Sequence, residues 1–518
     1  MSQRALRLLA VSLFVFCCAL PARATDPALE RGTAIIDPLA LRELDRGRLG
    51  LSRIMAPTQS ADAPLTNSQL FALPSMAEVR RALDEEFARY IARHKAELPN
   101  ETIGVGTSFD FQLFDPALLD SADTRFVLSG IVNRMDRAYV LDKSCGEIRL
   151  IYRLARIGAP AVGELDASPR LPMTLNVVLK AKGPGDAAIN CAEIARRWLD
   201  TAHLTATGAE LAEKLTAKDG PLASLGPLNI DRIETNLQIA HAPKSAIRDF
   251  RTDYLMKVFD YDAASSSFVE SPLENQIDRA RLLSDPDFAR DFKSWLLDPG
   301  HFEEFDRGTV VIPERFLVKG AVAVTPVGFA ASDLQPAFGL VAGEDDTKNP
   351  VFSEDDVVTA LKKLAARSVA PLNIRSAAGF ERRLNDMTCT GCHQTRGIGG
   401  FHFPGVDWMA EKPSNTIVVP ASPHFFGDQP RRRDILTAFA DGKAPDFSRS
   451  FSSRPQLRGS TELAGTEYED GWGAHCYLQH AKASENDASF RTWTCAEGLA
   501  CQVTPPATRM GMCFVKTR

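Results

Sequence analysis

The chain has 518 residues and a formal net charge of −6, with 44% hydrophobic and 24% charged residues. This length predicts two or three domains, and the average charged fraction predicts a globular chain. The mildly acidic balance excludes the strongly basic footprint that nucleic-acid-binding proteins carry.

The first 24 residues have the pattern of a secretory signal peptide. Arg4 and Arg7 precede an apolar run over 8–20, and Ala22-Arg23-Ala24 is a small-x-small cleavage site. The run is too short to span a membrane comfortably. No other stretch of the chain approaches the roughly 18 consecutive apolar residues that a membrane-spanning helix needs. We therefore expect a periplasmic or secreted protein with no stable membrane insertion after cleavage.

Residues 25–345 are expected to form one mixed domain. Val79, Leu83, Phe87 and Ile91 recur at helical spacing. Alternating or β-branched patterns predict several strands, and another helix is predicted to start near Cys191. The strand patterns lie at 126–132, 148–154, 173–179 and 316–324. Because they cluster instead of alternating strictly with helices, we predict an α+β fold class.

A polar, turn-prone stretch at 343–350 marks the expected end of this domain. Ser353 then opens a helix, with Asp356 three residues later as a capping partner. We assign 346–470 to a small, mostly helical or irregular region and 471–518 to a disulfide-stabilised module.

Eight cysteines remain once the signal peptide is removed, and export would place them in an oxidising compartment. Cys145 precedes a predicted strand and Cys191 a predicted helix, so we expect a disulfide between them. The C-terminal module holds the last four, which allow three pairings: Cys476, Cys495, Cys501 and Cys513. We favour a clasp that pins the C-terminus over a binding surface.

The motif with specific chemistry is Cys389-Thr390-Gly391-Cys392-His393, the pattern that attaches a c-type haem. Two thiols at this spacing add to the porphyrin vinyl groups, and the adjacent imidazole becomes the proximal iron ligand. Phe380, Leu384 and Met387 precede the motif at helical spacing. We therefore predict one haem c, bound through Cys389, Cys392 and His393 at the end of an amphipathic helix.

Three other interpretations of the motif stay open. Cys389 and Cys392 would form a redox-active dithiol, a structural disulfide or half of a zinc site. The sixth iron ligand is also open, since haem proteins use Met, His or an open position. Met409 and His424 are the leading candidates, with His402 or no ligand as alternatives.

Charged residues cluster in two other places. Asn133, Arg134, Asp136 and Arg137 follow one strand, near Glu147 and Arg149 on the next, and we interpret them as buried ion pairs. The run 431–433 is interpreted as a solvated basic stretch where a helix begins. The sequence has no nucleophile elbow, phosphate loop or second CxxCH, so no reaction is assigned.

Three segments resemble a group of uncharacterised exported bacterial proteins. They are Gly130-Ile-Val-Asn-Arg-Met-Asp-Arg137 and Cys145-Gly-Glu-Ile-Arg-Leu-Ile-Tyr152, with Leu171-Pro-Met-Thr174 following. Those proteins also end in a CxxCH-bearing region, and here Cys389–His393 and Gly400-Phe-His-Phe403 match. The resemblance extends over most of the mature chain but implies no activity. Only the haem motif is similar to something of known chemistry, the c-type cytochromes.

Electron transfer through one haem, with a redox partner protein, is the leading hypothesis. The alternatives are a haem-assisted enzyme of unknown substrate and a binding or structural protein with a Cys389–Cys392 disulfide.

Overall fold

The computed structural model describes residues 30–59, 63–140, 144–157, 170–181, 190–242, 251–325, 334, 351–390 and 423–449. Near the C-terminus it also describes 475–479, 481–482, 494–495, 498–502 and 510–515. The predicted signal peptide, 1–24, lies outside these residues.

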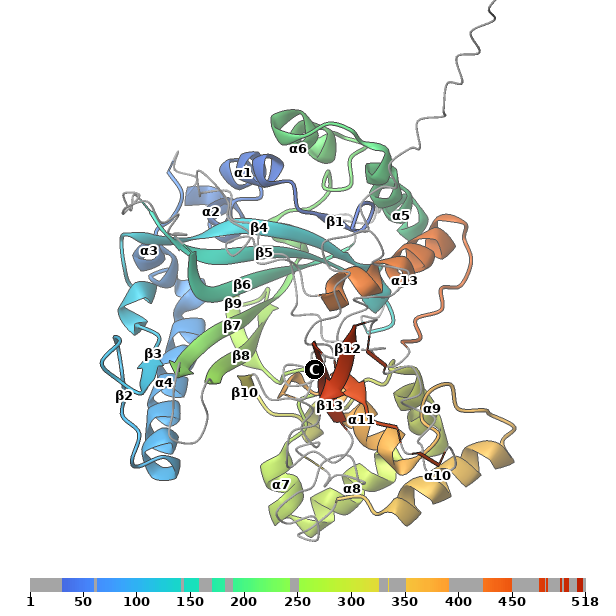
Figure 1. Cartoon of the computed structure of the whole chain (residues 1–518). Coiled ribbons are helices and arrows are strands. Elements are labelled where there is room, and N and C mark those ends of the chain that lie inside the picture. Colours follow the sequence, from blue (N-terminus) through green and yellow to red (C-terminus); the bar gives the residue numbers. More distant parts are fainter. Residues whose placement is uncertain are drawn as a thin grey trace, which may run out of the picture.

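A large, mostly antiparallel sheet is the centre of the fold (Figure 1). Its strands pair in the order β1-β4-β5-β6-β7-β3-β2, and β8 pairs with β7, β9 and β10. Together with the helices around it, this sheet confirms the α+β fold class. The strands are β1 (Ala34–Ile35), β2 (Ile103–Gly104), β3 (Phe111–Leu113), β4 (Thr124–Arg134), β5 (Glu147–Arg156), β6 (Arg170–Lys180), β7 (Ile230–Ala242), β8 (Arg251–Asp262), β9 (Ser267–Ser271) and β10 (Ala321–Thr325).

The first half of the chain supplies the helices that cover one face of the sheet (Figure 1). Successive strand side chains point to opposite faces, so Ile148, Leu150 and Tyr152 of β5 join these helices in one apolar cluster. The helices are α1 (Pro38–Arg46), α2 (Leu51–Met55), α3 (Asn67–Phe71), α4 (Ala77–Glu97), α5 (Cys191–Asp200) and α6 (Gly208–Thr216).

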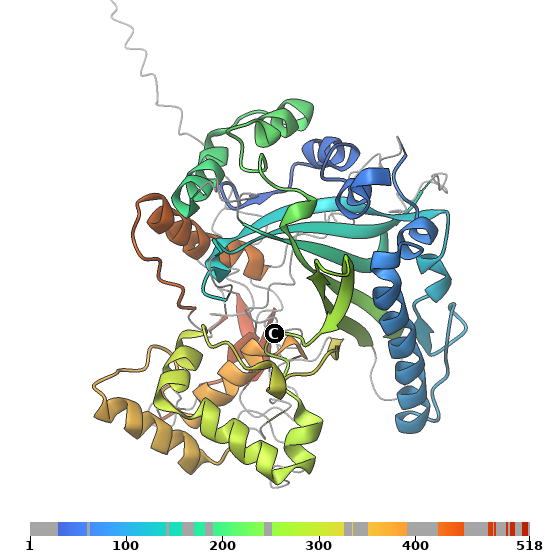
Figure 2. The ribbon, with the colours of Figure 1, turned by 180° about the vertical axis from the view of Figure 1, so that it is seen from behind.

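A second group of helices forms a separate lobe on the other side of the sheet (Figure 2). Its own apolar cluster is rich in phenylalanine and holds residues from both 277–317 and 351–384. This one cluster therefore includes residues from both sides of the boundary expected near 343–350. The helices are α7 (Arg279–Ser284), α8 (Pro286–Leu296), α9 (Pro299–Arg307), α10 (Glu354–Ala366) and α11 (Ala377–Met387). A further helix, α13 (Pro423–Ala440), packs against α5.

The helix expected from Val79 is α4, and the first three of the four predicted strands match β4, β5 and β6. The capping box of Ser353 and Asp356 is present at the start of α10. One predicted strand is shorter than expected. Residues 314–316 form a 3₁₀ turn, and β10 begins only at Ala321.

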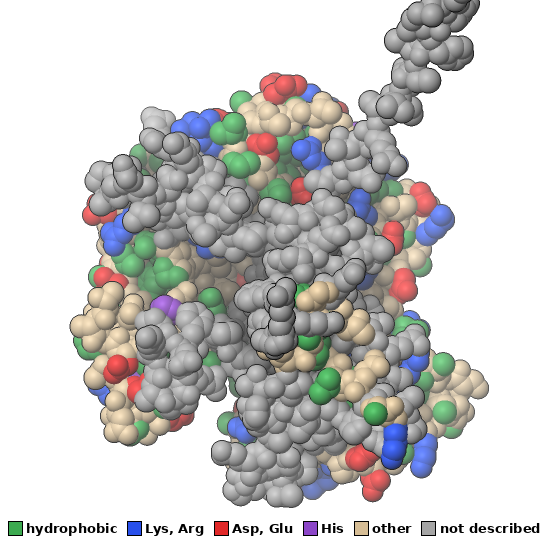
Figure 3. Space-filling view, in the orientation of Figure 1, with side chains coloured by type: hydrophobic (Ala, Val, Ile, Leu, Met, Phe, Trp, Pro, Cys, Tyr) green, Lys and Arg blue, Asp and Glu red, His purple; other side chains and the backbone are tan. Residues whose placement is uncertain are grey.

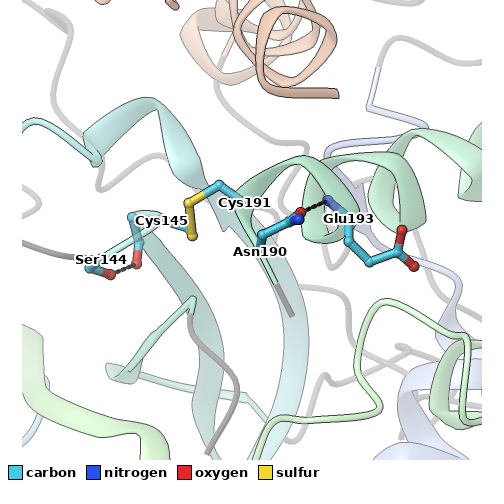
Figure 4. Close-up of a disulfide and its surroundings, with 6 residues drawn as sticks. Ser144, Cys145, Asn190, Cys191 and Glu193 are labelled. Atoms are coloured by element: carbon cyan, nitrogen blue, oxygen red, sulfur yellow. Dashed lines mark hydrogen bonds between the residues drawn. A yellow bond between two sulfur atoms is a disulfide. The ribbon is translucent and has the colours of Figure 1, made fainter. Parts of the chain in front are cut away.

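The expected disulfide joins Cys145 to Cys191 across 46 residues of sequence (Figure 4). It fixes the start of α5 beside the start of β5, and Asn190 caps that helix by accepting from the Glu193 N–H at 2.9 Å. In the C-terminal module, β11 (His475–Tyr477), β13 (Met510–Val515) and β12 (Leu499–Gln502) form a small sheet in that order. Cys476 pairs with Cys501 there, and Cys495 is disulfide-bonded as well.

Removing the Cys145–Cys191 link should destabilise the sheet domain. Crosslinks of this kind contribute about 2–4 kcal/mol, chiefly by restricting the unfolded chain. We expect Cys145→Ser/Cys191→Ser to lower the free energy of unfolding in urea by that amount. Cys476→Ser/Cys501→Ser is the matched control, since it opens a disulfide in a separate small sheet. An unchanged urea midpoint for the first variant would contradict the expectation.

Candidate functional site

The first residue of the haem motif lies just beyond α11. Ser376 begins this helix by accepting a hydrogen bond from the Gly379 N–H at 3.0 Å, and the helix ends at Met387. Phe380 and Leu384 are buried in the phenylalanine-rich cluster of the helical lobe. The predicted helix before the motif is therefore present, and it places Cys389 against the sheet.

Cys389 is buried and contacts the segment that follows β9. Its thiol donates to the Glu274 carbonyl oxygen at 3.7 Å. The neighbouring Thr390 N–H donates to Oε1 of Gln276 at 3.1 Å. Cys389 also packs with Met256, Val258 and other apolar residues on the outer face of β8 and β10. These contacts fix the start of the motif on the sheet face that α1–α6 do not cover.

A cavity of about 480 Å³ lies between that sheet face and the helical lobe, and Cys389 lines it. We call it the central cavity. Its volume falls within the range of about 300–1,000 Å³ that is usual for ligand sites. Part of its lining is apolar, namely Val258, Leu273, Val311, Ile312, Leu317 and Met387. Charged side chains line it as well, and several of them belong to two ion-pair groups centred on Glu147 and Asp136, which lie behind the lining.

The first charged group follows the strands and is an alternating ion-pair network. Glu147 is fully buried, and its carboxylate accepts from Arg149 at 3.0 Å and from Arg232 at 2.8 Å. Arg149 also binds Glu234 at 2.8 Å, and Arg137 bridges Glu147 and Glu274. Burial opposes ionisation of Glu147, but the charges of Arg232, Arg137 and Arg149 outweigh it and hold its pKa well below the usual range.

The second charged group surrounds Asp136, which the 3₁₀ turn after β4 carries. Arg134 binds its carboxylate through Nε at 2.8 Å and Nη2 at 3.3 Å. Arg431 of α13 binds it at 2.8 Å, and Arg449 binds it at 2.6 Å. Burial alone would raise the pKa of this carboxyl. The charges of Arg134, Arg432, Arg449 and Arg431 outweigh burial and hold the pKa well below its ordinary value.

Gly146 allows these two groups to meet. Its φ of +94° is one that residues with a side chain rarely adopt. A Cβ there would lie 2.6 Å from the Met135 Cα and 2.7 Å from the Arg134 carbonyl oxygen. The glycine therefore lets Glu147 enter β5 directly beside the turn that carries Asp136.

The structure brings together only part of the predicted haem site. Cys392, His393, His402 and Met409 lie outside the described residues. His424 lies in α13, but its side chain is not described. Within the described ranges no group of three or more His, Cys, Asp or Glu side chains could hold a metal ion, and none of the described helices is long and apolar enough to cross a membrane.

The predicted buried ion pairs are confirmed. The sequence did not show that their arginines line a cavity. Arg383 and Arg449 were missed as cavity residues, because they lie far from the 133–149 cluster in sequence. The interpretation of 431–433 as a solvated stretch is wrong for two residues. Arg431 binds both Asp136 and Asp428, and Arg432 is buried against Asp428 at 2.8 Å. Asp428 lies three and four residues before these arginines, and this helical spacing could have predicted the two ion pairs.

Comparisons with protein-family models, curated proteins and solved structures return no match for this chain.

The Asp136 carboxylate should be essential to stability. Removing one partner from a buried ion cluster usually costs about 3–5 kcal/mol, because the remaining charges lose their compensation. We expect Asp136→Asn to lower the free energy of unfolding by roughly that amount. Asp120→Asn is the control, since its carboxylate is 58% exposed in a surface pair with Arg80 and contributes little. Equal effects of the two substitutions would contradict the assignment.

The same carboxylate gives a pH dependence of known sign. The folded state lowers the pKa of Asp136, so its contribution is complete above the unfolded carboxyl pKa, near 3.9, and is lost as pH falls toward the folded value. Unfolding free energy should therefore drop from about pH 5 downward. Asp136→Asn should make that drop less steep, because it removes one carboxyl whose pKa folding lowers. Part of the drop should remain, because folding also lowers the pKa values of Glu147 and Asp428. Urea titrations at several pH values measure both slopes, and parallel slopes would refute the assignment.

Proposed function

We propose that this chain is an exported c-type haem protein that transfers electrons through one haem, attached through Cys389 and Cys392 with His393 as the proximal ligand. The observation that carries the proposal is the position of Cys389. This first residue of the CxxCH motif lines a cavity of about 480 Å³ instead of lying on an open surface.

The described surroundings of Cys389 fit such a group. A porphyrin has apolar faces, and Val258, Leu273, Ile312 and Leu317 line the cavity that Cys389 borders. Gln276 and the Glu274 carbonyl group hold the backbone and thiol at the start of the motif in place. A haem attached through Cys389 would therefore lie against apolar lining.

The chain's own residues would have separable tasks. Cys389 and Cys392 would hold the haem covalently, and His393 would ligate the iron. Haem supplies the capacity to accept and release one electron. The apolar lining would exclude water, which is one of the factors that set a haem's reduction potential. Met409 and His424 remain the leading candidates for the sixth ligand, with His402 or an open position as alternatives.

Localisation and partners follow from the same proposal. The Cys145–Cys191 and Cys476–Cys501 disulfides support an oxidising compartment, the periplasm or the exterior. Electron transfer requires a redox partner, which we propose to be a protein. On the face shown in Figure 3, the described acidic and basic side chains are interspersed. That mixture and the net charge of −6 support the expectation that nucleic acid is not a partner.

Covalent attachment can be tested directly. We expect the full chain, exported in a host with cytochrome c maturation machinery, to give a haem-stained band on a denaturing gel. Cys389→Ser/Cys392→Ser should abolish the stain, because both thioether bonds are lost. Cys476→Ser/Cys501→Ser, the matched control, should keep it. A colourless chain with Cys389 and Cys392 joined as a disulfide would instead support a binding or structural protein.

Assays and spectra of the folded, haem-containing protein would then distinguish the remaining alternatives. Turnover of peroxide or a small reductant would favour a haem-assisted enzyme over simple electron transfer. The optical spectrum of the reduced state distinguishes methionine from histidine as the sixth ligand, and Met409→Ala and His424→Ala would show which residue supplies it.

A further inference from the structure

Three arginines from distant parts of the chain line one side of the central cavity. Arg134 ends β4, Arg383 lies in α11, and Arg449 follows α13. We call them the arginine wall. Arg383 and Arg449 are in direct contact, because Nη2 of Arg383 donates to the Arg449 carbonyl oxygen at 2.8 Å. Arg134 and Arg449 meet at the shared Asp136 carboxylate.

Two donors of the arginine wall are buried without a partner among the residues that the structure describes. Arg134 uses Nε and Nη2 to bind Asp136, and its Nη1 is unpartnered although the residue is only 1% exposed. Arg449 uses Nη2 for Asp136, and its Nε is unpartnered. A buried N–H without an acceptor is unfavourable, and a ligand oxygen would satisfy it.

Among the residues that the structure describes, arginines also outnumber the carboxylates around Asp136. Arg134, Arg431, Arg432 and Arg449 gather around two carboxylates, Asp136 and Asp428. Arg383 instead lies near Asp386 and Asp306. By contrast, the network on the strands balances Glu147, Glu234 and Glu274 against three arginines.

Neighbouring like charges also affect the pKa values of two of these arginines. Burial and the nearby charge of Arg134 together lower the pKa of Arg432 to about 10. Burial and the charge of Arg431 likewise lower the pKa of Arg449. An added anion would relieve both effects.

We propose that the arginine wall is a binding site for a carboxylate-bearing ligand in the central cavity. A guanidinium group and a carboxylate match in shape and charge, and their hydrogen bonds are among the strongest in proteins. The apolar lining beside the wall favours an amphipathic molecule. Two sources supply this chemistry, the propionates of a haem attached at Cys389 and a free organic acid. The first source rests on the proposed function, whereas the site itself does not.

The site can be tested without covalent haem. The full chain carrying Cys389→Ser/Cys392→Ser is titrated with protoporphyrin IX and with its dimethyl ester, following porphyrin fluorescence. The two probes share the same apolar ring, but only the first has carboxylates. We expect the free acid to bind at least about tenfold more tightly, which corresponds to about 1.4 kcal/mol. Equal affinities would overturn the proposal.

Variants of the wall test which donors act. In the same background, Arg449→Lys keeps a positive charge near Asp136 but removes the unpartnered Nε, and we expect it to reduce the preference for the free acid. Arg134→Gln should reduce the preference for the free acid as well. If this variant fails to fold, the comparison of the two probes on the protein with an unsubstituted wall still tests the proposal. Arg290→Gln is the control, because its side chain is 75% exposed and far from the wall in the sequence. A preference that survives both wall substitutions would overturn the proposal.

A third probe distinguishes the two sources. Phthalate, a small free dicarboxylate, is titrated calorimetrically into the folded cysteine variant and into folded wild-type protein that carries the haem. Binding to the variant alone supports the wall as a propionate site that the haem fills. Binding to both, weakened by Arg449→Lys, supports a site for a free organic acid. Absence of covalent haem would refute the proposed function, while the porphyrin comparison would still test the wall.

Discussion

The carboxylate of Asp136 holds together parts of the chain that lie about 300 residues apart. It accepts from Arg134 next to it in sequence, from Arg431 across 295 positions and from Arg449 across 313. Each charge is costly to bury alone, so the cluster forms only when all its members arrive together. This requirement fixes α13 and the segment after it against the end of β4, and so determines where the central cavity forms.

The alternation of residues along the strands determines what the cavity contains. In β5, Ile148, Leu150 and Tyr152 face the apolar cluster, so Glu147 and Arg149 must face the opposite side. A sheet with one charged face ordinarily exposes it to water. Here the helical lobe covers that face, and the charges are satisfied by ion pairs. The space that remains between lobe and sheet is lined by apolar side chains, Cys389 and several arginines.

Much of this fold could be predicted because its signals are local. The periodicity of α4, the alternation in β4 to β6 and the Cys145–Cys191 disulfide all follow from residue types at short spacing or from export. The site could be predicted only in part. Nothing near Arg383 or Arg449 in sequence indicates that they approach Asp136, because contacts across 300 residues leave no periodic pattern. The run 431–433 was misread for the same reason, since its main partner besides Asp428 is Asp136.

The electron-transfer proposal depends on Cys389 and Cys392 carrying a haem in the mature protein. Mass spectrometry of the peptide spanning both cysteines, digested from chain exported with maturation machinery, tests it most directly. We expect a peptide heavier by the mass of one haem, with no free thiol at either cysteine. A peptide lighter than its reduced form by two hydrogens, with the two sulfurs joined, would contradict the account.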